Sequence, residues 1–367
     1  MNVKKADLKK ALAKVNSFVS KDLISSAPPR VLFRAKDGMV EITSCNGTDF
    51  GQFRFKTEDQ SDLSFIVELK SLNRAGALRG DPSIEFEKDS PESDKGCMEL
   101  KNGDTKMVFP AESGDCYPAG DFKVKSEKHL SLPTDEFKKL VSKVSYCRNE
   151  KDQRIFVTGM RIKFDGTTLR VDTTDSICAM SNKYVFAEDQ GFSFEGLISP
   201  KAISMIENLE DGQQVVIGID EQAFEIESED TTVYTPLLNA NFPDIEQLYD
   251  RVVNNSEFSI DKADILESLA LFSMSDNKSL VFEGEGDRIV IHQEDGVTEI
   301  KDVIPMSDFN GSAFKFCIDF DNIRDAFQNI KEGSTRLHFV FQSELGAIKI
   351  FDDENLVGLL QPMRKDA

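Results

Sequence analysis

Carboxylates are the most abundant groups in this chain that could carry out chemistry. The 367 residues include 65 Asp and Glu against 44 Lys and Arg, a net charge of −21. Among the places where acids lie close together, three could be drawn as magnesium sites for hydrolysis. These are Asp319 with Asp321, Asp352 with Asp353 and Glu354, and Glu225 with Glu227. None has the glycine and terminal acid of an EF-hand loop, and P-loop, HExxH and GxSxG motifs are missing. We therefore expect no catalytic residues and no enzyme activity.

Soft metal ligands are few. The three histidines and six cysteines are spread along the sequence without a CxxC pair, so we expect no zinc site and no cofactor. Residues 1–7 lack the apolar stretch of a signal peptide, and no run of about 18 apolar residues exists. These features predict a cytoplasmic protein without a membrane partner, whose thiols stay reduced.

Basic residues gather in two segments, against the acidic average. Residues 4–21 contain six lysines and a single acid, and residues 138–154 contain six bases and two acids. Such groups could neutralise the phosphates of nucleic acid, although the net charge alone argues against nucleic-acid binding. The candidate DNA-binding residues are Lys9, Lys10, Lys14, Lys21, Lys138, Lys139, Lys143, Arg148, Lys151 and Arg154. A basic lining inside an acidic exterior would suit a protein that surrounds a polyanion without adhering to it.

The simpler interpretation of either basic segment is an ordinary solvated helix face, because amphipathic helices that carry lysine are common. The recurrence of the pattern in an acidic chain favours a segregated basic surface instead. Both interpretations stay open from the residues alone.

The elements that would position these residues repeat three times, about 128 residues apart. Apolar residues at helical spacing predict helices over 7–15, 136–144 and 264–272. Each is followed by alternating strands around a turn, and the turn glycines Gly38 and Gly166 show the same separation. A second helix and further strands complete each repeat, with the helices over 69–78, 200–209 and 320–330. We expect an α+β fold of three similar domains, at 1–125, 126–250 and 251–367, each a duplicated helix-plus-strands unit.

Three short motifs carry a family resemblance. They are Thr174-Asp175 after a strand, Phe242-Pro243-Asp244, and the terminal Gln361-Pro362-Met363-Arg364. With these motifs the chain resembles the bacterial DNA polymerase III beta subunit, the DNA sliding clamp. The resemblance covers the whole chain. It implies the DNA clamp fold, and a homodimeric ring with helices inside and sheets outside. The implied function is that of a processivity factor in DNA replication, which encircles double-stranded DNA without reading its sequence and tethers the polymerase.

The resemblance also implies a groove between the middle and C-terminal domains that binds peptide motifs of the DNA polymerase and clamp loader subunits. The groove residues carried over are Val157, Thr174, Ser176, Ile177, Pro243, Gln247, Leu248, Leu345, Ala347, Leu359, Leu360, Gln361, Pro362, Met363 and Arg364. Val157 is expected on a strand, and Arg364 is expected to contact an anionic group. Simple packing between domains would equally explain these Pro and Leu residues.

One segment departs from the family pattern. Residues 174–178 read Thr-Asp-Ser-Ile-Cys where many clamps have Thr-Asp-Gly-His-Arg, so the peptide preference is expected to differ, as in a divergent bacterial or phage clamp. For the ring interface, residues 107–109, Phe272 and Met274 are candidates, with buried core as the alternative. A rival interpretation is an acidic protein-binding scaffold that does not encircle DNA, which would not need clustered lysines.

Overall fold

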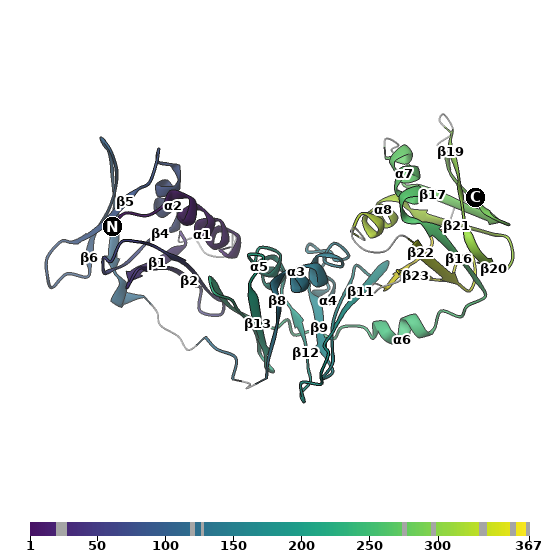
Figure 1. The fold of residues 1–367 in the computed structure, drawn as a ribbon, viewed down its shortest axis with the longest axis horizontal. Coiled ribbons are helices and arrows are strands. Elements are labelled where there is room, and N and C mark those ends of the chain that lie inside the picture. Colours follow the sequence, from purple (N-terminus) through teal and green to yellow (C-terminus); the bar gives the residue numbers. More distant parts are fainter. Residues whose placement is uncertain are drawn as a thin grey trace. The chain divides into compact units, whose positions relative to one another are not determined.

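The computed structural model describes residues 1–19, 28–117, 122–125, 128–273, 277–294, 299–329, 336–352 and 357–364. Antiparallel sheets with short helices packed on them make up the chain, which confirms the predicted α+β class (Figure 1). The chain divides into two compact units, residues 1–138 with 198–237, and residues 139–197 with 238–367. No helix in the described part is long and apolar enough to cross a membrane.

An eleven-stranded sheet forms the first unit, in the order β5-β6-β7-β4-β1-β2-β3-β15-β14-β13-β8. Its strands are β1 (Arg30–Lys36), β2 (Met39–Cys45), β3 (Phe50–Lys56), β4 (Leu63–Glu68), β5 (Ser83–Lys88), β6 (Lys95–Asn102), β7 (Thr105–Ser113), β8 (His129–Pro133), β13 (Gln214–Ile219), β14 (Ala223–Glu227) and β15 (Thr231–Pro236). Its helices are α1 (Lys5–Phe18), α2 (Leu69–Ala77), α5 (Pro200–Glu207) and the 3-10 turn η1 (Gly114–Cys116). Helix α3 (Thr134–Ser142) runs across the boundary between the units.

Helix α1 shows why the sequence folds this way. Leu8, Leu12, Val15 and Phe18 recur at helical spacing and are buried, while the lysines lie on the other faces. Burial of each such side chain contributes about 1.5–3 kcal/mol. The helix packs on α2, on β3 and on α5, so it contacts the segment near residue 200 as well as its own neighbours.

A nine-stranded and a four-stranded sheet form the second unit, in the orders β12-β9-β10-β11-β24-β23-β22-β16-β20 and β19-β18-β17-β21. The strands are β9 (Met160–Phe164), β10 (Thr168–Thr174), β11 (Cys178–Val185), β12 (Phe194–Ile198), β16 (Ser256–Asp261), β17 (Ser279–Glu285), β18 (Arg288–Glu294), β19 (Glu299–Pro305), β20 (Ser307–Asn310), β21 (Phe314–Asp319), β22 (Arg336–Phe341), β23 (Ile348–Asp352) and β24 (Val357–Leu360). The helices are α4 (Ile155–Thr158), α6 (Ile245–Asp250), α7 (Lys262–Phe272) and α8 (Phe320–Asn329).

The large sheets join strands that are far apart in sequence. In the first unit β3 pairs antiparallel with β15, over Phe50–Phe53 and Thr231–Tyr234. In the second unit β11 pairs with β24, from Cys178↔Leu360 to Ser181↔Val357. Strands β3 and β11 are each the third strand after an opening helix, and β19 holds the same place after α7. Within the described residues β19 pairs with β18 alone.

Strand β7 has a second incomplete edge. It pairs with β6 along its whole length, from Lys95↔Glu112 to Asn102↔Thr105. Its other side meets β4 only at Ser113 and Glu112. Residues 105–111 therefore have no partner strand on that side within the described part of the chain.

All six predicted helices are present, as α1, α2, α3, α5, α7 and α8. The predicted turn at Asp37-Gly38 is a tight hairpin in which both residues have positive φ, 52° and 75°. One local prediction is wrong, because Val157 lies in helix α4 and the strand begins only at Met160. Ile155, Val157 and Thr158 favour a strand by propensity. A hydrogen-bonded turn forms instead, in which the N–H of Val157 donates to the carbonyl of Arg154 and the carbonyl of Val157 accepts from the N–H of Asn149.

Candidate functional site

The basic residues of α1 divide into exposed and paired groups. Lys9 and Lys10 are exposed, and the Nζ of Lys10 lies 4.0 Å from Glu210 Oε1. The Lys14 side chain is only 12% exposed and pairs with Asp230 and, at 3.7 Å, with Glu210. Lys21 lies outside the described residues. The structure therefore leaves Lys9 and Lys10 available to an external polyanion and holds Lys14 in an internal ion pair.

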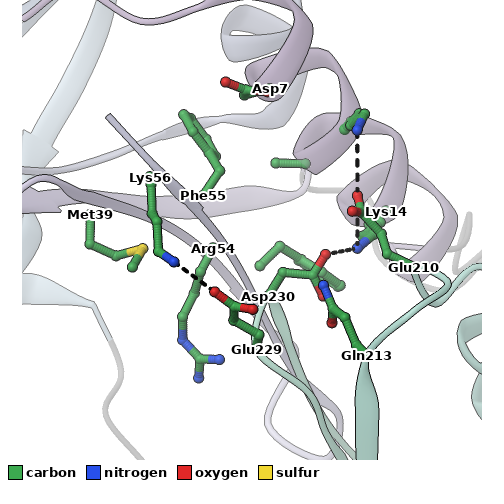
Figure 2. A pocket seen from close by; sticks show the side chains of 13 residues that line it. Asp7, Lys14, Met39, Arg54, Phe55, Lys56, Glu210, Gln213, Glu229 and Asp230 are labelled. Carbon is green, nitrogen blue, oxygen red and sulfur yellow. Dashed lines mark hydrogen bonds and ion pairs between the residues drawn. The ribbon is translucent and has the colours of Figure 1, made fainter. Parts of the chain in front are cut away.

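Lys14 borders a cavity of 270 Å³, where side chains of α1 and β3 meet Glu229 and Asp230, the two residues just before β15 (Figure 2). Lys56 of β3 pairs with Glu229 at 2.7 Å, just before β15, and Arg54 donates to Thr232 Oγ1 at 2.6 Å. These pairs span the pairing of strands from distant parts of the sequence. The half-buried pair of Lys14 and Asp230 should contribute more to the stability of the first unit than the pair of Lys56 and Glu229, whose side chains are 76% and 64% exposed.

The pKa of Asp230 reflects two opposing effects. Burial raises the pKa of this carboxyl, but the hydrogen bond and charge of Lys14, together with hydrogen bonds from Thr231 and Ser228, outweigh burial, and the net pKa is lowered. The pair's contribution to stability should therefore be present above the pKa of an unfolded aspartate, about 3.9, and fade as the pH falls through the lower folded value.

Replacing Lys14 with methionine should destabilise the first unit, by about 2–3 kcal/mol near pH 7, because Asp230 would stay half-buried without its cation. Lys10→Met is the matched control, since that side chain is 68% exposed and its removal should change stability by less than about 0.5 kcal/mol. Urea unfolding followed by circular dichroism would measure both variants. Equal midpoints for the two would show that the Lys14–Asp230 pair contributes nothing.

The second basic segment is mostly outside a helix. Helix α3 ends at Ser142, so only Lys138 and Lys139 lie on it, and the residues from Lys143 to Arg154 follow in turns and loops. Lys138 pairs with Asp211 at 2.6 Å, Arg148 with Glu150 at 2.7 Å and Arg154 with Asp152 at 2.7 Å. Lys139 and Lys151 are exposed, and Lys143 is half-buried. The expected basic helix face is therefore shorter than the sequence pattern indicated.

A second cavity, of 450 Å³, lies wholly within the second unit, and we refer to it as the groove. It lies where the start of β11, helix α6, the turn before β23 and strand β24 meet. The lining residues are Phe156, Thr174, Ser176, Ile177, Cys178, Ala179, Pro243, Ile245, Leu248, Arg251, Val252, Gln342, Gly346, Ala347, Leu359 and Gln361. Most of these side chains are apolar, which is the composition of a site that anchors an apolar group of a ligand.

The rim of the groove is a tightly hydrogen-bonded turn over residues 174–178. Asp175 Oδ1 accepts from the N–H groups of Ile177 at 2.7 Å and Cys178 at 2.6 Å, and Thr174 Oγ1 accepts from the N–H of Ser176 at 3.0 Å. Ser176 has a positive φ of 80°, a conformation that normally favours glycine. The turn is linked to the C-terminal segment because the N–H of Gln361 donates to the carbonyl of Ile177 at 3.2 Å.

The structure brings together eight of the fifteen predicted groove residues. They are Thr174, Ser176, Ile177, Pro243, Leu248, Ala347, Leu359 and Gln361. Gln247 and Leu345 are exposed close by, and the carbonyl of Leu345 accepts from Gln361 Nε2 at 2.9 Å. The remaining predicted residues do not line the groove.

Those residues have other positions. Val157 and Leu360 are buried in the core, and Pro362 is also buried. The N–H of Met363 donates to the carbonyl of Cys317 at 2.7 Å, so the chain there pairs with β21. Arg364 is exposed but does not line the groove. The end of the terminal segment is thus bonded to β21 through Met363, and a role of Pro362, Met363 and Arg364 in partner binding stays a prediction.

The sequence interpretation missed several groove residues. Ile245, Arg251 and Val252 belong to α6 and the turn after it, beside the predicted Leu248. Their spacing of three and four residues is typical of an amphipathic helix and could have identified this wall. Phe156, Cys178, Ala179, Gln342 and Gly346 were also missed, and no local pattern distinguishes them.

A buried ion pair supports the groove wall. Arg161 Nε donates to Asp172 Oδ2 at 2.8 Å, and the Asp172 side chain has no exposed surface. Burial raises the pKa of Asp172, and the charge of Arg161 opposes this rise without cancelling it. The Arg161 guanidinium lies 5.4 Å from the centre of the Phe242 ring, directly before Pro243 of the groove. Phe242 in turn packs on Ala179, Ile245, Tyr249 and Leu359.

Metal ligands do not converge in the described residues, where no group of three His, Cys, Asp or Glu side chains could hold an ion. The acid pairs considered from the sequence include Asp321, which pairs with Lys278 and Arg324, and Glu225, which accepts from the N–H of Val124. Asp353 and Glu354 lie outside the described residues. All six cysteines are described, and none forms a disulfide.

Known proteins resemble this chain along its length. The family model of the DNA polymerase III beta subunit, central domain, matches residues 131–244. The beta sliding clamp of Bacillus subtilis (strain 168) is 22% identical over 282 residues, which cover 72% of each chain. A crystal structure of the Bacillus subtilis clamp superposes with a TM-score of 0.87 at 17% identity, covering 100% of this chain and 99% of that one. The Pseudomonas aeruginosa clamp bound to griselimycin has a TM-score of 0.86 at 15% identity, with 100% and 99% coverage. The resemblance to the DNA polymerase III beta subunit is thus confirmed, and this chain has the fold of the bacterial beta sliding clamps.

Proposed function

We propose that this protein is a DNA sliding clamp, a ring of two copies that encircles double-stranded DNA and tethers partner proteins during replication. It holds no catalytic machinery and works by topology. The division into domains at 1–125, 126–250 and 251–367 and a cytoplasmic location belong to the same proposal. The observation that carries it is the regular pairing of strands between repeats, which, within the described residues, leaves one strand edge open at each end of the series.

The pairing rule is simple. The third strand after an opening helix pairs with the last strand of the next repeat, as β3 does with β15 and β11 with β24. Strand β19 is the third strand of the last repeat, and β7 is the last strand of the first repeat. Both edges are incomplete within the described residues. In a dimer, β19 of each copy would pair with β7 of the other copy. These two pairings would complete the open edges of both copies and close a ring with two-fold symmetry.

Exposed lysines support passage of DNA. Lys9, Lys10, Lys139 and Lys151 are exposed in segments that open the first and second repeats. Attraction between such side chains and phosphates would keep DNA central without fixing its position, because phosphate contacts carry no base information. The acidic remainder of the chain would repel DNA from other faces.

The groove supports the tethering role. Its apolar lining, 450 Å³ volume and hydrogen-bonded rim suit a short peptide segment of a partner such as a polymerase or clamp loader subunit. A flexible partner segment held there would raise the local concentration of the partner at the DNA.

A topological test distinguishes a ring from a surface binder. Dimers reassembled from diluted monomers in the presence of nicked circular DNA should stay with the DNA during gel filtration at about 0.5 M salt, where contacts between exposed charges are largely screened. Cutting the circle once with a restriction enzyme should release the protein.

Equal retention on circular and linear DNA would contradict encirclement. Absence of retention on either DNA, with peptide binding intact, would favour an acidic protein-binding scaffold. The clustering of exposed lysines in equivalent segments favours the clamp.

A further inference from the structure

Among the described residues, Arg251 is the only charged one that lines the groove. It follows α6 directly, so its backbone caps that helix, and its side chain is exposed at the groove. The protein as a whole carries a net charge of −21. The positive charge of Arg251 is therefore unusual, both for an apolar groove and for an acidic protein.

No carboxylate in the described part of the chain forms an ion pair with Arg251. Its Nη2 donates to Gln247 Oε1 at 2.6 Å, one turn earlier, and this neutral bond uses one of its five N–H donors. Two acids lie in α6: Glu246 is paired with Arg170 and with Lys163 at 3.7 Å, and Asp250, which directly precedes Arg251, forms no ion pair with it. Arg251 is thus held in place by Gln247 and still has donors for an external acceptor.

Two other basic side chains near the groove are either paired with a carboxylate or lie outside the groove lining. Arg154, whose guanidinium lies 5.9 Å from the centre of the Phe156 ring, is paired with Asp152. Arg364 does not line the groove. The groove therefore presents a single cation next to apolar surface.

The apolar surface beside Arg251 is held rigidly. Ile177 is 55% exposed on the rim, although the hydrogen bonds around Asp175 and the bond from Gln361 fix its backbone. Leu248 is 37% exposed on the helix that leads to Arg251. Ordered, exposed apolar side chains of this kind are typical of a surface that becomes covered by a partner.

We propose that the groove selects a peptide that carries a carboxylate next to apolar anchor residues, with Arg251 as the receptor for that carboxylate. The apolar side chains would pack on Ile177 and Leu248, while the free N–H donors of Arg251 form charge-assisted hydrogen bonds to the carboxylate. This inference rests on the groove being a peptide site, as proposed above. It adds the chemical class of the peptide and a residue that determines specificity.

A matched peptide panel would test the inference. The probes are nine-residue fluorescent peptides of Gly and Ser with two adjacent leucines at the centre, with a single Glu moved through the remaining positions, and a second set with Gln in its place. Each is made with a free and an amidated C-terminus, so that a side-chain carboxylate is distinguished from a terminal one. Anisotropy at low salt and at 0.5 M salt gives the dissociation constants for the intact protein and its variants.

For the unmodified protein, at least one Glu position or the free C-terminus should bind about three- to tenfold more tightly than its neutral counterpart, and high salt should reduce the difference. Arg251→Gln should remove the preference, and so should Gln247→Glu, which supplies an internal carboxylate four residues before Arg251. Leu248→Ala should weaken acidic and neutral peptides by the same factor. Circular dichroism should show unchanged folding for all three variants.

Two failures are distinguishable. If no peptide binds, or if Leu248→Ala changes nothing, the groove is not a peptide site, and the proposed function loses its tethering element. If peptides bind and Leu248→Ala weakens them, but Glu and Gln sets bind equally or the preference survives Arg251→Gln, only the role of Arg251 is overturned.

Discussion

Aspartate at both Val108 and Val303 should convert a dimer of this protein into monomers. Val108 of β7 and Val303 of β19 are 50% and 48% exposed on the two incomplete strand edges. In a ring, each of the two interfaces would bring one such β7 next to one such β19. Burying two like charges at each interface should cost at least about 2 kcal/mol per interface, which is enough to shift a closed dimer strongly towards monomers.

Light scattering after gel filtration would measure the change, from twice the chain mass of 41.1 kDa to the single chain mass. Val185→Asp is the matched control, because Val185 is 56% exposed at the end of β11, where it pairs with Thr168 of β10, and it lies on neither of the two incomplete edges. The double variant should also lose retention on circular DNA in high salt, while the control keeps it. A double variant that remains dimeric would show that these edges do not form the interface.

Replacing Arg161 with methionine should destabilise the second unit by about 3–5 kcal/mol, because Asp172 would remain fully buried without its cation. The effect should depend on pH. Burial already raises the pKa of Asp172, so the folded state holds its proton more tightly than the unfolded state does. Removal of Arg161 would raise that pKa further. The loss of stability caused by Arg161→Met should therefore be full at neutral pH, and it should shrink as the pH falls through the pKa of Asp172 in the folded state.

Chemical unfolding followed by circular dichroism between pH 4 and pH 8 would measure this loss. The control is the double variant Arg161→Met with Asp172→Leu, which removes both charges and should recover most of the stability. Peptide binding should weaken in the single variant, because Phe242 and the adjacent Pro243 lose the support of Arg161. A single variant as stable as the unmodified protein at neutral pH would contradict the role of the pair.

Much of the fold could be predicted because it is encoded locally. The apolar spacing of Leu8, Leu12 and Val15, and its recurrence near residues 136 and 264, identified the helices that open each repeat. The Asp37-Gly38 turn was predicted because few residue pairs accept positive φ at both positions. These features depend on a few neighbouring residues.

The ion pairs could not be predicted because their partners are distant in sequence. Lys14 looked like a solvent-facing lysine, and only the pairing of β3 with β15 brings Asp230 to it. Phe272, considered for the ring interface, is fully buried at the end of α7, and Met274 lies outside the described residues. Arg251 was overlooked because its significance comes from its place in the groove lining and from the lack of an ion pair with any described carboxylate, and the composition of α6 alone does not show this.

The pairing of β3 with β15 and of β11 with β24 also bears on how such a protein can change over evolutionary time. Those junctions are built from backbone hydrogen bonds, which every residue other than proline can supply. Substitution can therefore alter most side chains in these strands without separating one repeat from the next. Groove chemistry, by contrast, depends on individual side chains such as Ile177 and Arg251. A protein of this design can exchange the partners it recognises while its architecture is inherited almost unchanged.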